Sequence, residues 1–208
     1  MAVDQIGRND AADRTMIALA RLAFNLALPT EEAGKTALFS PERENRWVYR
    51  LFEKAVLGFA SVELEPLGWK VRGGVALKWP ISHMSGGIAG ILPTMITDII
   101  LDAPQRTRRV VIDTKFSSIL TRGRFGDSGL KSGHLYQMYA YLRSQEDGTD
   151  VAATASGLLL HPATDATLSE RVIIQNHDIA FSTVDLSGKA EAIRQELRSI
   201  LLTKCAIS

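Results

Sequence analysis

Hydrophobic residues recur with a helical period in four segments of the chain, and runs rich in β-branched and apolar residues lie between them. The helical segments are 10–28, 41–64, 134–147 and 187–202. Strands are predicted within 68–79, 94–103, 108–116, 151–163 and 171–186. This order predicts an α/β fold whose mixed β-sheet is flanked by helices, with 94–103 and 108–116 as antiparallel neighbours.

The breaks between these elements divide the chain into two parts. Residues 1–40 are expected to form one helix and a connector, and residues 41–208 a single compact domain. Ser40 followed by Pro41 is typical of a helix start, because serine caps free N–H groups and proline fits the first helical turn.

Composition narrows the class of protein. Hydrophobic residues make up 46% of the chain and charged residues 23%, as in ordinary globular proteins. The single Cys205 cannot form an internal disulfide, and no signal sequence is evident, so we expect a cytoplasmic protein. The longest uncharged run, 79–97, contains two prolines and three glycines, which favours a loop and a strand over a membrane span.

The distribution of charge and the missing motifs narrow the function further. The formal net charge is only +1, but residues 104–131 hold seven Lys or Arg against two Asp. Such a stretch suits a polyanionic ligand, and it equally suits a solvated loop. The chain has no P-loop, no zinc-ligand spacing among its four histidines and no G-x-S-x-G elbow, so we expect neither GTP hydrolysis nor zinc or serine chemistry.

The strand predicted at 108–116 carries two opposite charges on one face. Alternation along a strand puts Asp113 and Lys115 on the same side, while Ile112, Thr114 and Phe116 face the other way. An edge-strand ion pair is the simpler explanation of this tripeptide alone, because a chain of this composition contains an acid-x-Lys match about once by chance.

Asp98 interrupts the otherwise apolar strand that precedes it. If the two strands pair, Asp98 and Asp113 approach closely enough to hold one divalent cation, and oxygen ligands suit Mg²⁺ or Mn²⁺. Lys115 beside that cation could stabilise an attacking hydroxide and the charge that develops on a phosphate.

Two helices add candidate residues. Glu53 lies among apolar neighbours at helical spacing, where a carboxylate must be paired or coordinate a ligand; the alternative is a salt bridge to an arginine. Gln137 and Tyr141 lie one turn apart and could present an amide and a phenol to a phosphate, or could simply face solvent. The core stripe of their helix is predicted to be Leu135, Met138, Tyr139 and Leu142.

Together these residues resemble the PD-(D/E)xK nuclease superfamily. The matching features are a helix acid, Glu53; a strand acid, Asp98; the run Asp113-Thr114-Lys115; and Gln137-x-x-x-Tyr141. More narrowly, "RLFEKAVLGF", "ITDIIL", "VVIDTKF" and "HLYQMYAYL" are similar to the catalytic domain of the McrC-type subunits of 5-methylcytosine-specific restriction systems. Pro93 stands five residues before Asp98 rather than beside it, so it is not counted as part of the motif.

The resemblance implies a restriction-endonuclease-like fold for residues 41–208 and a Mg²⁺-dependent DNA endonuclease, with Mn²⁺ able to substitute. The catalytic residues that it implies are Glu53, Asp98, Asp113, Lys115, Gln137 and Tyr141. Metal ligands would be Asp98 and Asp113, helped by Glu53 and the carbonyl of Thr114. Contacts to the DNA backbone are expected from Arg122, Arg124 and Lys131.

A McrB-type AAA+ GTPase is the partner that the resemblance implies. Only about 40 residues precede the helix of Glu53, where such subunits usually carry a long region that docks on the GTPase, so the contact itself stays open. Two alternatives also stay open. One is a RecB-like repair or recombination exonuclease, which shares the Gln-x-x-x-Tyr pattern, and the other is a non-catalytic DNA-binding accessory subunit.

Overall fold

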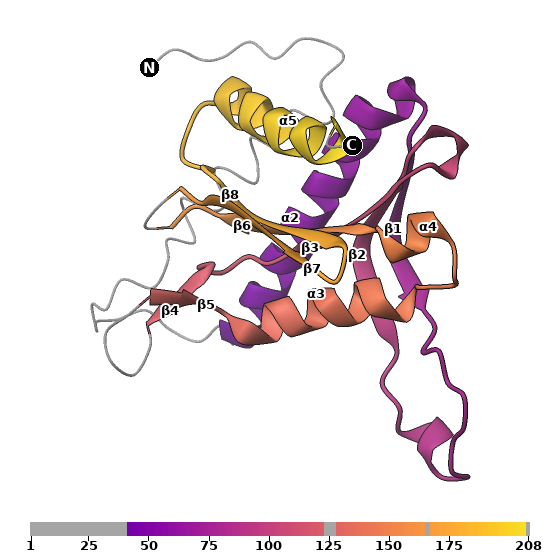
Figure 1. Cartoon of the computed structure of the whole chain (residues 1–208). Coiled ribbons are helices and arrows are strands. Elements are labelled where there is room, and N and C mark those ends of the chain that lie inside the picture. The colour runs from indigo at the N-terminus through magenta and orange to yellow at the C-terminus, as the bar shows by residue number, and fades with distance from the viewer. Residues whose placement is uncertain (1–40, 123–127, 165–166, 207–208) are drawn as a thin grey trace.

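A computed structural model describes residues 41–122, 128–164 and 167–206 (Figure 1). The predicted helix at 10–28, its connector and Arg124 lie outside the described residues. The helices are α2 (Pro41–Leu64), α3 (Ser132–Ser144), α4 (Asp150–Ala153) and α5 (Ala190–Ala206), with 3-10 turns η1 (Glu65–Leu67), η2 (Ile88–Gly90) and η3 (Pro104–Arg106). The strands are β1 (Lys70–Leu77), β2 (Met95–Asp102), β3 (Arg109–Thr114), β4 (Leu120–Arg122), β5 (Ser128–Leu130), β6 (Ser156–Pro162), β7 (Ser169–Ile174) and β8 (His177–Val184).

Six strands form one mixed sheet in the order β1-β2-β3-β6-β8-β7. β1, β2 and β3 pair antiparallel, β6 is parallel to both β3 and β8, and β7 returns antiparallel to β8. Helices α2 and α5 cover one face of this sheet and α3 covers the other (Figure 1). The predicted α/β fold is confirmed, and the arrangement is consistent with a restriction-endonuclease-like fold.

The two faces of the sheet bury separate apolar clusters. Phe52 and Phe59 of α2 pack with Ile112 and Leu160 on one face, whereas Met138 and Leu142 of α3 pack on the other. All seven residues of β6 are buried, because this strand lies at the centre of the sheet with helices on both sides. Its sequence is therefore an apolar run, "SGLLLHP", instead of an alternating one.

Three sequence predictions were wrong in detail. Residues 150–153 form the short helix α4, capped by the hydroxyl of Thr149, before β6 begins. The expected loop after β3 contains the small hairpin of β4 and β5, which forms a second sheet. Tyr139 is not a core residue; its hydroxyl bonds to the side chain of Gln175, and Tyr141 is buried in its place. No helix in the described ranges is long and apolar enough to cross a membrane.

One buried ion-pair cluster joins the three antiparallel strands. Asp102, at the end of β2, pairs with Arg72 of β1 at 2.6 Å and with Arg109 of β3 at 2.7 Å. Burial opposes ionisation of Asp102, but the hydrogen bonds and charges of the two arginines outweigh it and lower the pKa of its carboxyl group.

We expect Asp102→Asn to lower the free energy of unfolding by about 1–3 kcal/mol, because two guanidinium groups lose their partner. The lowered pKa means that the ionised carboxylate stabilises the fold above its unfolded value of 3.8, and that this contribution is lost as pH falls through the folded value. Urea unfolding of both proteins at pH 7 and near pH 3 measures the difference, which should shrink in acid. An equal difference at both pH values would contradict this assignment.

Candidate active site

The register of β2 and β3 brings two acids together. Ile99 pairs with Ile112, so Asp98 lies one step further along, opposite Asp113. Both side chains are on the α3 face of the sheet, because Ile100 and Val111, two residues away in each strand, belong to the core beneath α3.

Asp98 is held in place by the neighbouring strand. Its Oδ2 accepts hydrogen bonds from the backbone N–H of Thr114 at 2.7 Å and from the Thr114 hydroxyl at 2.8 Å. These two bonds fix the carboxylate across the end of β3 and leave Oδ1 without a partner from the described residues.

Asp113 is the most deeply buried acid of the site. It is 1% exposed, and Lys115 Nζ lies 2.8 Å from its Oδ2, although neither carboxylate oxygen has a hydrogen bond of normal geometry within the described residues. Burial raises the pKa of Asp113 to about 6; the charge of Lys115 opposes the rise, and that of Asp98 adds to it. Keeping this carboxylate ionised at neutral pH therefore lowers the stability of the fold.

Glu53 approaches the same acids from α2. The expected alternative, a salt bridge to an arginine, is not found, since Glu53 has no ion pair or hydrogen bond within the described residues. Burial raises the pKa of Glu53, and the charge of Asp98 raises it further, whereas Lys54, Arg50 and Lys115 lower it. Its environment thus links it electrostatically to Asp98 and Lys115.

Gln137 and Tyr141 join α3 to the site. Gln137 Nε2 donates to the Tyr141 hydroxyl at 2.5 Å, and that hydroxyl donates to the carbonyl of Ile96 in β2 at 2.8 Å. Burial raises the pKa of Tyr141; the bond from Gln137 lowers it, and the charge of Asp113 raises it. The phenol thus braces α3 against β2, and among the described residues the side-chain oxygen Oε1 of Gln137 has no hydrogen-bond partner.

The predicted DNA-binding residues are placed unequally. Lys131 precedes α3 as its N-cap, and its Nζ lies 3.3 Å from the hydroxyl of Ser117, two residues beyond Lys115. Arg122 ends β4, but its side chain, like all of Arg124, lies outside the described part of the chain. Of these three residues, Lys131 is the one whose side chain is described, and it lies beside Ser117, close to Lys115 in the sequence.

Two histidines near the site went unassigned in the sequence. His161 is 1% exposed, its Nδ1 bonds to the carbonyl of Ser117 at 2.8 Å, and its ring lies 5.4 Å from that of His134. Burial lowers the pKa of His161 to about 4 in spite of the Ser117 bond, so the ring is neutral and Nδ1 carries the proton. The sequence offers no signal for this pair, because 27 residues and a strand crossover separate the two rings.

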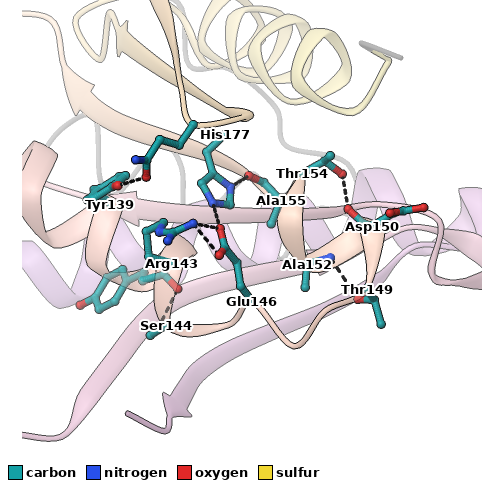
Figure 2. Close-up of polar contacts among 12 residues, drawn as sticks. Tyr139, Arg143, Ser144, Glu146, Thr149, Asp150, Ala152, Thr154, Ala155 and His177 are labelled. Atoms are coloured by element: carbon teal, nitrogen blue, oxygen red, sulfur yellow. Dashed lines mark hydrogen bonds and ion pairs between the residues drawn. The ribbon is translucent and has the colours of Figure 1, made fainter. Parts of the chain in front are cut away.

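A second polar cluster lies at the other end of α3 (Figure 2). His177 is fully buried between the carbonyl of Ala155 and the carboxylate of Glu146, at 2.8 Å from each. Arg143 binds both oxygens of Glu146 at 2.5 Å. These bonds tie the β7–β8 turn to the end of α3, so we interpret the cluster as a structural brace.

The acids of the site suit a divalent cation. No group of three or more His, Cys, Asp or Glu side chains in residues 41–122, 128–164 and 167–206 is arranged to hold a metal ion by itself. Mg²⁺, however, is commonly bound by one or two carboxylates together with water and substrate phosphate oxygens. Within the part of the chain that the structure describes, Asp113 is buried with neither oxygen in a normal hydrogen bond, and Asp98 has one oxygen without a partner, so both fit that requirement.

Comparison with known proteins gives one informative match. No protein-family model matches the chain. The chain is similar to the type IV methyl-directed restriction enzyme EcoKMcrBC of Escherichia coli strain K12, with 28% identity over 196 residues. The match covers 93% of this chain and 54% of the relative, so the chain spans about half the length of that protein. This similarity supports the relationship to McrC-type subunits that the motifs indicate.

Proposed function

We propose that this chain is a Mg²⁺-dependent DNA endonuclease that hydrolyses phosphodiester bonds as a subunit of a McrBC-like modification-dependent restriction system. The observation that carries the proposal is Asp113, a buried carboxylate opposite Asp98 with neither oxygen in a normal hydrogen bond to a described residue. Buried carboxylates are usually hydrogen-bonded, whereas Asp113 has only its ion pair with Lys115 among the described residues, so its oxygens can accept a further ligand such as a cation. Similarity to EcoKMcrBC over most of the chain supports the kind of system.

Asp98 and Asp113 would hold the cation, with Glu53 and the Thr114 carbonyl as further oxygen donors, and Mn²⁺ suits the same donors. When bound, Mg²⁺ supplies positive charge that polarises the scissile phosphate and lowers the pKa of a coordinated water. Thr114 orients Asp98 through two hydrogen bonds, so the carboxylate needs little rearrangement on binding.

Lys115 contributes the one cationic side chain of the catalytic set. Asp113 holds its ammonium group 2.8 Å away, where it can stabilise a hydroxide or the charge developing on phosphate. Gln137, turned by its bond to Tyr141, would orient the attacking water or a backbone phosphate. Lys131 and the predicted Arg122 and Arg124 would attract the DNA backbone without choosing its sequence.

DNA and a McrB-type AAA+ GTPase are the partners that we propose. The chain has no P-loop of its own and no evident base-reading motif. Recognition of methylated sites and hydrolysis of GTP would therefore reside in the partner.

Supercoiled plasmid is the direct test of cleavage. With Mg²⁺, and with the GTPase where it is required, we expect nicked and linear products that EDTA abolishes. Digestion only of linear DNA would instead indicate the RecB-like exonuclease, since an exonuclease needs an end. DNA retention without any metal-dependent product would indicate the accessory subunit and overturn the proposal.

A further inference from the structure

A long excursion between β1 and β2 leaves the body of the protein. We call residues 78–94 the finger; Figure 1 shows it projecting well beyond the sheet and the helices. Its large apolar side chains face solvent, with Trp79 37%, Ile81 48%, Met84 53% and Ile91 77% exposed. Apolar surface of this kind on a projecting segment marks a contact with a partner molecule.

The finger is folded rather than loose. At its base, Trp79 Nε1 donates to the carbonyl of Pro93 at 2.7 Å and closes the two arms. At its tip, the carbonyl of Ile88 accepts from the N–H groups of Ile91 at 3.0 Å and Leu92 at 2.9 Å. The backbone of the finger is therefore ordered at its base and around Ile88, which lowers the entropy lost on binding.

The finger is continuous with the candidate active site. Ile96, just beyond its base, accepts the Tyr141 hydrogen bond, and Asp98 follows two residues later. Ile91 is seven residues before Asp98, so at 3.3–3.6 Å per residue it lies at most roughly 25 Å from that acid. The finger is therefore close enough to the candidate site to contact a duplex bound there.

The chemistry of the finger suits DNA better than a charged protein surface. Residues 79–97 contain no Asp or Glu, so nothing on the finger repels phosphates, and Lys78 stands at its root. Isoleucine, methionine, leucine and proline are the side chains that architectural proteins insert between base steps from the minor groove. Such wedges unstack and bend DNA without reading a sequence.

We propose that the finger is an apolar wedge whose exposed Met84 and Ile91 enter the minor groove of the DNA bound for cleavage. The proposal rests on the proposed function, because it places the duplex at Lys115. The wedge opens the base stack of the same duplex away from the scissile phosphate and helps to hold the strand in the site.

The test measures DNA distortion separately from cleavage. In an Asp113→Asn background, which keeps DNA intact, we compare the wild-type finger with Met84→Ser/Ile91→Ser. The probe is a duplex with 2-aminopurine at successive positions, read by fluorescence, with affinity from anisotropy. We expect the wild-type finger to increase 2-aminopurine fluorescence on binding and the double variant to abolish this increase. The double variant should also bind the duplex about tenfold more weakly, and a mismatched, already flexible base step should restore its affinity.

Ile173→Ser is the matched control, because Ile173 is 63% exposed on β7, at the opposite edge of the sheet. It should leave both signals unchanged. The same fluorescence in the wild-type and double-variant fingers would overturn the wedge. So would a double variant that alters only self-association, measured by light scattering, because the finger would then bind a second copy of the chain. If unstacking depends on the finger but the protein with Asp113 intact shows no metal-dependent cleavage, the wedge is retained and only the nuclease is refuted.

Discussion

Asp113→Asn should abolish plasmid cleavage while making the metal-free protein more stable. The amide keeps the shape of the side chain but loses the charge that a cation needs, and it withdraws the anion that holds Lys115 in place. Removing one group that stabilises transition-state charge costs about 10²–10³-fold in rate. We expect at least that loss, measured as initial nicking rate with saturating Mg²⁺.

The gain in stability follows from the same burial. Asp113 is 1% exposed, and its pKa, raised to about 6, exceeds the unfolded value of 3.8. The protonated carboxyl therefore stabilises the fold below about pH 4, and this contribution is lost as pH rises through about 6. At pH 8 in EDTA the neutral amide should raise the free energy of unfolding by about 1–3 kcal/mol, because the variant has no buried charge that must be kept ionised.

Asp102→Asn is the matched control, because it also removes a buried acid from the same sheet. Asp102 is fully paired, so its amide variant should lose stability at the pH at which the Asp113 variant gains it, and should still cleave DNA when folded. A loss of stability in the Asp113 variant would mean that the ion pair with Lys115 stabilises the fold by more than the burial of the charge destabilises it. That result would refute the interpretation that Asp113 is kept ionised in order to bind a ligand.

Much of the site could be predicted because period-two alternation is a local property. "VVIDTKF" places Asp113 with Lys115 whatever surrounds it, and Asp98 follows once 94–103 pairs with 108–116. The antiparallel pairing was predictable because only a short turn joins the strands, and the structure confirms it. Glu53 could be singled out because its helix neighbours are apolar.

The remaining features depend on contacts between distant segments. Residues 151–153 are apolar and suit a strand as well as a helix, and here the Thr149 hydroxyl caps them as a short helix. Tyr139 and Tyr141 are equally aromatic in the sequence. Tyr141 can be buried because its hydroxyl donates to the Ile96 carbonyl. This bond joins residues 45 positions apart, so the helical pattern of the sequence does not predict it. The finger was predictable only as an uncharged loop; its projection requires the sheet.

The packing of the core beneath the site should affect the affinity for a metal ion. Phe52 is 1% exposed and precedes Glu53, and its ring meets that of Phe116 edge-on at 5.6 Å; Phe116 follows Lys115. One aromatic contact thus joins the helix that carries Glu53 to the strand end that carries Lys115. We therefore expect truncation of either ring to loosen the positions of both charged side chains.

We expect Phe52→Ala to lower the free energy of unfolding by about 3–5 kcal/mol, as for other buried phenylalanines, a large part of the stability of such a domain. Phe59, 4% exposed and two turns further along α2, is the control, and Phe59→Ala should cost a similar amount. The two variants should differ in Mg²⁺-dependent stabilisation, which reports affinity through the rise in melting temperature with cation concentration. The rise in melting temperature with Mg²⁺ should persist in Phe59→Ala and should shrink in Phe52→Ala and in the milder Phe52→Leu. Equal rises in all three variants would show that the contact with Phe116 supports only the core.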